Sequence, residues 1–197
     1  MDVFPSLSRL QEYAKAGCYD VAPVSVELYA DVATPIETLK AFKERGEACF
    51  LFESVEGGEK WARYSFIGFS PVEEIFVKDG VVTITEGASV RTVNTSDPNA
   101  EIRKILSKYK SPQINGLPTF TGGFVGYFAY EYYKYAEKID LPAGVFGDAR
   151  LFLFNKVVAY DNVKHKIVVL TNVSLYGDLE ENYRVAIEEL QGIKQVI

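Results

Sequence analysis

The sequence has little of what several common kinds of site require. Its 197 residues include one histidine, His165, and two cysteines, Cys18 and Cys49, with no cluster at the spacing of a zinc site. Two cysteines are too few for a disulfide framework, and we expect both to be buried thiols in a reducing compartment. Histidine-based catalysis would have to use His165, which has lysines on both sides and no carboxylate neighbour to orient it. We therefore interpret His165 as a solvent-exposed turn residue.

An excess of positive charge and a long apolar run are also missing. Lys and Arg total 21 against 27 Asp and Glu, which gives a net charge of −6 and excludes a basic nucleic-acid binder. No apolar run reaches the roughly 18 residues of a membrane span, and the first residues lack the basic and apolar regions of a signal peptide. We expect a cytoplasmic protein that binds neither nucleic acid nor membrane.

Aromatic residues are abundant. There are 13 Phe, 13 Tyr and one Trp, or 14% of the chain, within a composition that is otherwise ordinary for a globular protein. Such residues favour strands and a large packed sheet core. The length suits one sizeable domain or two small ones.

Periodicity predicts a mixture of strands and helices. Strands are expected at 21–30, 48–55, 61–69, 72–77, 81–85, 89–93, 119–127, 150–160 and 166–173. Helices are expected at 7–16, 35–45, 98–110 and 128–138 and from 179 onward, with Ser6, Thr34 and Asp178 as N-caps. Asp79-Gly80 is the best hairpin signal, because this pair suits a type I′ turn. The pattern indicates an α+β protein.

A search for reactive groups finds no catalytic constellation. The glycines in Gly122-Gly123-Phe124-Val125-Gly126 lack the spacing of a phosphate-binding loop and indicate a bulge or a close backbone approach in a strand. Glu73 and Glu74 are adjacent on a predicted strand, so they point to opposite faces and cannot share a proton. From the residues alone we expect neither a catalytic nor a metal site.

The last predicted helix has no stop signal. Ile193, Val196 and Ile197 continue its periodic pattern, and no Gly or Pro follows them. We expect a truncated chain, cut inside or just after this helix, with a frayed natural C-terminus as the alternative.

Three segments together resemble the N-terminal domain of anthranilate synthase component I. They are FLFESVEGGEKWARYSFIGFSP at 50–71, PVSVELYADVATP at 23–35 and GGFVGYFAYE at 122–131. The last segment has Glu131 where this family usually has Asp. In order and spacing the resemblance covers most of residues 20–173.

The resemblance implies an α+β fold of two packed, mainly antiparallel sheets flanked by helices, a sandwich. It implies that residues 1–197 are a regulatory and structural domain, and that the C-terminal chorismate-binding domain, with its Mg²⁺ and all catalytic residues, is absent from this chain. The complete protein would make anthranilate and pyruvate from chorismate and ammonia. The ammonia would come from a glutamine amidotransferase subunit, component II. This chain alone is expected to be inactive.

The family is feedback-inhibited by tryptophan, and the resemblance carries the inhibitor site over by position. The family's Leu-Glu-Ser element corresponds to Phe52, Glu53 and Ser54, with Phe52 in place of leucine. A basic residue of the family corresponds to Arg63, and a proline that opens a helix corresponds to Pro35. Glu53 or the backbone of Ser54 suits an ammonium group, while the Ser54 hydroxyl or Arg63 suits a carboxylate. The alternative is a cross-strand surface ion pair between Glu53 and Arg63, which would contribute under about 1 kcal/mol.

Two other identities remain open from the sequence. One is the related domain of aminodeoxychorismate synthase component I, and the other is a stand-alone amino-acid-binding or scaffold domain without catalytic activity. A reading frame that continues past Ile197 into a chorismate-binding domain would exclude the scaffold.

Overall fold

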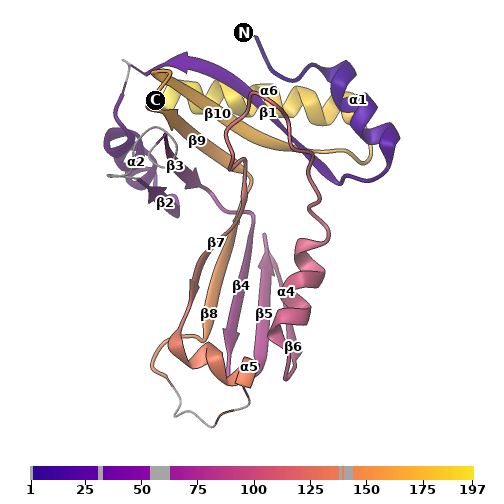
Figure 1. Ribbon diagram of the computed structural model, residues 1–197, viewed down its shortest axis with the longest axis vertical. Helices are drawn as coiled ribbons and strands as arrows, with labels where there is room; N and C mark the ends of the chain where they lie inside the picture. Colours follow the sequence, from indigo (N-terminus) through magenta and orange to yellow (C-terminus); the bar gives the residue numbers. More distant parts are fainter. Residues whose placement is uncertain (1, 31–32, 54–62, 138, 140–143) are drawn as a thin grey trace. The chain divides into compact units, whose positions relative to one another are not determined.

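Two five-stranded antiparallel sheets organise the chain, each within its own compact unit (Figure 1). The computed structural model describes residues 2–30, 33–53, 63–137, 139 and 144–197. Unit 1 contains Met1–Ser70, Tyr109–Gly122 and Asn155–Ile197. Unit 2 contains Pro71–Lys108 and Gly123–Phe154.

The sheet of unit 1 joins strands from both ends of the chain. Its order is β1-β10-β9-β3-β2. The strands are β1 (Val21–Tyr29), β2 (Cys49–Phe52), β3 (Tyr64–Phe69), β9 (Lys156–Asp161) and β10 (Lys166–Ser174). β10 lies inside the sheet between β1 and β9, and four successive residues from Ile167 to Leu170 are buried. Successive apolar residues of this kind are typical of a strand that is buried on both faces of its sheet.

Three helices pack onto one face of this sheet. They are α1 (Leu7–Ala16), α2 (Pro35–Glu44) and α6 (Leu179–Val196). Thr34 and Glu37 form a capping box that starts α2, with Pro35 at its first position. Asp178 caps α6, and Gly17 ends α1 with a left-handed φ of 67°. The core beneath these helices includes Leu10, Phe42, Ile67, Tyr160, Val169 and Leu190.

The opposite face of the same sheet has a smaller core. Val157, Ala159, Val168 and Leu170 form it, and Phe66, Leu117 and Phe120 pack against it. Leu117 and Phe120 belong to the connection that follows Tyr109 in unit 1. This face carries the candidate site described below.

The sheet of unit 2 has the order β6-β5-β4-β8-β7. Its strands are β4 (Glu73–Lys78), β5 (Val81–Glu86), β6 (Ser89–Asn94), β7 (Gly123–Phe128) and β8 (Ala149–Phe154). The helix α4 (Pro98–Leu106) buries Ile102 and Ile105, and a 3₁₀ turn (Tyr130–Tyr133) leads into α5 (Lys134–Glu137). Asp79 and Gly80 join β4 to β5 with φ of 48° and 78°, the positive values that a type I′ turn requires.

A polar network fastens α5 to that turn. Asp148, only 2% exposed, accepts hydrogen bonds from Tyr135 Oη at 2.6 Å, Lys134 Nζ at 3.1 Å and the Asp79 amide at 2.8 Å. The Gly80 amide donates to Tyr135 Oη at 2.7 Å. Burial raises the pKa of Asp148, but the hydrogen bonds from Tyr135 and Lys134 outweigh it, so the pKa lies below its usual value.

The expected class of two antiparallel sheets flanked by helices is confirmed. The expected single strand at 150–160 is wrong, because the chain leaves β8 at Phe154 and enters the other sheet as β9 at Lys156. The expected burial of both cysteines is also wrong, since Cys18 is exposed and Cys49 is half-buried. The close backbone approach expected in the glycine segment is confirmed at Gly126. None of the described helices is long and apolar enough to cross a membrane.

Candidate functional site

The β2–β3 pair places aromatic rings on the face of the unit 1 sheet opposite the helices. Phe52 lies directly across from Phe66, and Phe50 lies across from Gly68. A Cβ on Gly68 would be 2.1 Å from Phe50 Cε1, so the missing side chain gives the Phe50 ring its space. Alternation puts Leu51 on the other face, where it packs against the helix-side core.

The rings form a continuous aromatic row, which we define as Phe50, Phe52, Tyr64, Phe66 and Phe120. Phe120 meets the rings of Phe66 and Phe50 edge-on, with centroid distances of 5.6 Å and 6.2 Å. Phe50 and Phe52 are 4.7 Å apart, and Tyr64 and Phe66 are 5.6 Å apart. Phe52 is 53% exposed, so the row presents an aromatic face to solvent at the end of β2. Such a surface can stack a flat apolar group.

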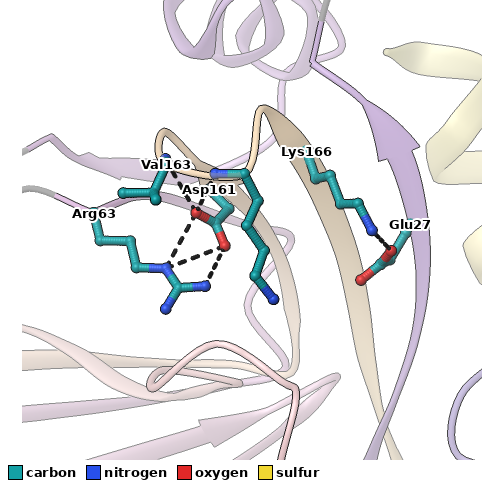
Figure 2. Close-up of polar contacts among 6 residues, drawn as sticks. Glu27, Arg63, Asp161, Val163 and Lys166 are labelled. Atoms are coloured by element: carbon teal, nitrogen blue, oxygen red, sulfur yellow. Dashed lines mark hydrogen bonds and ion pairs between the residues drawn. The ribbon is translucent and has the colours of Figure 1, made fainter. Parts of the chain in front are cut away.

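An arginine–carboxylate pair, Arg63 and Asp161, lies at the Tyr64 end of this row. Figure 2 shows the contacts between these two side chains. Arg63 Cζ is 4.8 Å from the centroid of the Tyr64 ring. Its Nε is 3.1 Å from Asp161 Oδ1, and its Nη2 is 2.6 Å from Asp161 Oδ2. The pairing of β3 with β9 sets Tyr64 opposite Asp161, which brings the two charges together. This two-point geometry is the strong form of an arginine–carboxylate contact.

Asp161 is fully engaged at the end of β9. It is 4% exposed and also accepts hydrogen bonds from the amides of Val163, at 3.2 Å, and Lys164, at 3.0 Å. Burial raises the pKa of Asp161, but the hydrogen bonds from Arg63 and these amides outweigh it and hold the pKa below its usual value. The Arg63 guanidinium is therefore held in place, with Nη1 outside the pair.

The structure brings together only some of the residues predicted from the sequence. Phe52 ends β2, and Glu53 follows it as an exposed residue, while Arg63 precedes β3. Pro35 starts α2, which packs on the helix-covered face, so it does not share a surface with Phe52. Ser54 lies outside the described residues. The alternative of a Glu53–Arg63 surface pair is wrong, because Arg63 pairs with Asp161 instead.

Sequence reasoning missed Asp161, Phe50 and Phe120 as parts of this site. Phenylalanines at alternate positions, Phe50 and Phe52, were a signal for one face of a strand. Nothing local signalled Asp161, because its contact with Arg63 depends on β3 pairing with a strand almost a hundred residues away.

The described residues include no candidate metal site. Within the ranges that the structure describes, no group of three or more His, Cys, Asp or Glu side chains could hold a metal ion. The Mg²⁺ that the resemblance implies for the complete protein therefore has no fitting donor set in this part. His165 is exposed in the β9–β10 turn, with a φ of 52°.

Sequence comparison finds relatives that are named as anthranilate synthases. Anthranilate synthase component 1 of Acetivibrio thermocellus is 37% identical over 199 residues, which cover 98% of this chain and 39% of that protein. The protein of the same name from Aquifex aeolicus is 36% identical over 172 residues, 85% of this chain and 35% of its own length. The chain thus spans about two fifths of the length of these curated relatives. No protein-family profile matches it.

A solved structure supports the fold. The crystal structure of anthranilate synthase component I from Streptococcus pneumoniae aligns with a TM-score of 0.50 and 23% identity, over 83% of this chain and 36% of that one. At this identity the likeness concerns the fold alone. Over nearly its whole length, the chain is thus similar in sequence to about two fifths of the proteins named anthranilate synthase component 1.

Proposed function

We propose that this chain is the N-terminal, tryptophan-sensing and structural part of anthranilate synthase component I. The observation that carries the proposal is the match to proteins of that name over 98% of this chain but only 39% of their length. The complete protein then converts chorismate and ammonia to anthranilate and pyruvate in tryptophan biosynthesis, in the cytoplasm. The catalytic residues and the Mg²⁺ site belong to the remaining three fifths of the protein. Component II, a glutamine amidotransferase, supplies the ammonia.

The aromatic row and its flanking charges support a site for a free aromatic amino acid. The indole ring of tryptophan stacks on the exposed end of the row at Phe52. Glu53, exposed beside it, receives the ammonium group. Arg63 faces the carboxylate with Nη1, while Asp161 fixes its Nε and Nη2. We assign Ser54 to the same site on the family resemblance alone.

The described part of this site is open, so we expect the chain alone to bind tryptophan weakly. An aromatic ligand gains most when it is enclosed on nearly all sides. Burial of apolar surface contributes about 25 cal/mol per Å² to the binding free energy. If about 100 Å² of apolar ligand surface stays in contact with water, about 2.5 kcal/mol of binding free energy is lost, which lowers the affinity about a hundredfold. The second wall of the site would come from the catalytic part of the protein.

The test uses the complete enzyme with Ser54 replaced by phenylalanine. Ser54→Phe should fill the site and relieve inhibition by tryptophan, while turnover of chorismate without inhibitor stays close to that of the parent enzyme. Ser8→Phe, at an exposed position on α1, is the matched control and should stay inhibited. Anthranilate fluorescence at increasing tryptophan concentration measures both effects.

Two results would contradict the assignment. Undiminished inhibition of the Ser54→Phe enzyme would show that tryptophan binds elsewhere. Loss of basal turnover would show a structural role for Ser54. Anthranilate produced by the purified 197-residue chain, above a mock preparation, would contradict the placement of catalysis in the remainder of the protein.

A further inference from the structure

The edge of the unit 2 sheet at β6 has an unusual lack of protection. Five of the six residues of β6 are exposed, and Val90 is 64% exposed. The strand contains no proline or glycine, and Arg91 is its single charged residue. Edge strands in natural proteins are usually blocked by proline, charges, bulges or covering segments. Among the residues that the structure describes, β6 has one charge and none of the other devices.

The other sheet edges show the contrast. β1 carries Pro23, which has no amide hydrogen, and Ser25 exchanges backbone hydrogen bonds with Phe4 at 2.7 Å and 2.9 Å. The Val21 amide, at the start of β1, donates to the carbonyl of Lys110 at 3.2 Å. β2 is only four residues long. β7 has two glycines among its six residues, which weaken a strand as a template.

The register fixes which backbone groups of β6 point outward. The two-residue loop between Glu86 and Ser89 makes that pair a hydrogen-bonded one, and such pairs then alternate along an antiparallel ladder. Gly80 and Thr95 come next after the last pair of the ladder, where the alternation predicts another hydrogen-bonded pair. The amide of Thr95 indeed donates to the Gly80 carbonyl at 2.8 Å. Ser89, Arg91 and Val93 therefore bond to β5. The remaining residues, Val90, Thr92 and Asn94, direct their N–H and C=O groups away from the sheet.

We propose that β6 pairs antiparallel with β6 of a second copy of this chain and joins the two unit 2 sheets. Centred on Thr92, the pairing sets Thr92 opposite Thr92 of the second copy and Val90 opposite Asn94. Each of these pairs exchanges two hydrogen bonds, so every outward group is satisfied. No shift of register satisfies all three residues in both copies.

The charges favour the same register. Arg91 lies opposite Val93 of the second copy, where its methylene stem covers an apolar side chain while its guanidinium stays in water. A two-fold axis at Arg91 would instead place two guanidinium groups directly opposite each other, which is destabilising. Self-complementarity of both backbone and side chains makes a second copy the occupant that this edge fits.

The first experiment removes one outward donor. Thr92→Pro deletes an amide that makes no bond to β5, and with it both central hydrogen bonds of the pairing, so association should weaken about tenfold or more. Thr92→Val keeps the amide and should associate like the parent chain. Analytical ultracentrifugation over a concentration series measures the association, and far-UV circular dichroism confirms that both variants are folded.

A second pair of variants tests the register without touching the backbone. Val93→Lys sets like charges opposite Arg91 of the second copy and should weaken the dimer, whereas Val93→Glu sets opposite charges there and should strengthen it. Both variants place a charge at the same half-buried position, so any effect on folding should be similar. A difference in dimer affinity between them therefore reports on the β6–β6 contact.

Amide hydrogen exchange supplies a residue-level readout. As the concentration rises, exchange at Val90, Thr92 and Asn94 should slow together, while Arg91 and Val93 stay protected throughout. A chain that is monomeric at every concentration would overturn the proposal. So would association that survives Thr92→Pro, equal effects of Val93→Lys and Val93→Glu, or concentration-dependent protection confined to other strands.

Discussion

Gly126 of β7 lies so close to Arg150 of β8 that a Cβ on the glycine would be 1.9 Å from the Arg150 carbonyl oxygen. The neighbour is backbone in the middle of a sheet, and it cannot rotate away as a side chain could. The β7–β8 pairing therefore depends on the absence of a side chain at position 126.

Gly126→Ala should lower the free energy of unfolding by about 3 kcal/mol, the upper part of the range for overpacking. Gly192→Ala is the matched control, because its Cβ would meet nothing within 4 Å and alanine favours the helix α6. The control should raise stability by about 0.5–1 kcal/mol. Urea denaturation measures both, and equal effects of the two substitutions would contradict the close approach.

Asp148 should be the most costly carboxylate to remove from unit 2. Asp148→Ala leaves the Lys134 ammonium and the Asp79 amide without a buried acceptor, and we expect a loss of about 3 kcal/mol. Asp79 also contacts Lys134, but its side chain is 53% exposed, so Asp79→Asn should cost under about 1 kcal/mol. Thermal unfolding of the two variants compares them, and a ranking in the opposite order would show that the network is not what holds α5.

Asp161 should contribute to the pH dependence of stability, as should Asp148. The folded-state pKa of Asp161 lies below its unfolded value of about 3.9, so its contribution is present above that value and is lost as the pH falls through the folded-state pKa. Asp161→Asn should lower stability at pH 7 and flatten the loss of stability below about pH 4. Urea denaturation at several pH values between 2 and 7 tests this, and an unchanged acid slope would contradict it.

A buried hydroxyl pair ties α2 to β9. Tyr160 Oη is 2.6 Å from Thr38 Oγ1 and donates to the Thr34 carbonyl at 3.3 Å. Tyr160→Phe should cost about 1–2 kcal/mol, because the Thr38 hydroxyl loses this partner inside the core. Thr38→Val in the same chain should cost less than it does alone. Additive effects in this double-mutant cycle would mean that the two hydroxyl groups are not coupled.

Features encoded within a few residues were predictable. The Thr34-Pro35 start of α2 and the Asp79-Gly80 turn were both expected, and both have the expected geometry. In each case the deciding interaction joins residues at most three positions apart. Gly126 was recognisable as a close approach for a similar reason, since a glycine inside a strand pattern has few other uses.

Features that depend on distant strands were not predictable. The stretch at 150–160 has apolar runs on both sides of Asn155 and Lys156 and no glycine or proline between them, yet the chain changes sheets at Asn155. Its carbonyl accepts hydrogen bonds from the backbone amide and the side chain of Asn172, at 3.0 Å and 3.1 Å, and neither bond is visible in local periodicity. The Arg63–Asp161 pair could not be predicted for the same reason, because the two residues are neighbours only through the pairing of β3 with β9.

The strand order of the unit 1 sheet also determines when its strands can pair during synthesis of the chain. β1 pairs with β10, so Val21 meets its partner Ser174 only after some 150 further residues have been made. At about 5–20 residues per second, the first strand waits roughly 8–30 seconds on the ribosome without its sheet neighbour. β3 can pair with β2 early, but it meets β9 only after some 100 further residues have been made. In the nascent chain, β1 and β3 therefore lack these partner strands until the last quarter of this sequence has been made. During that interval their apolar side chains are exposed and available to chaperones.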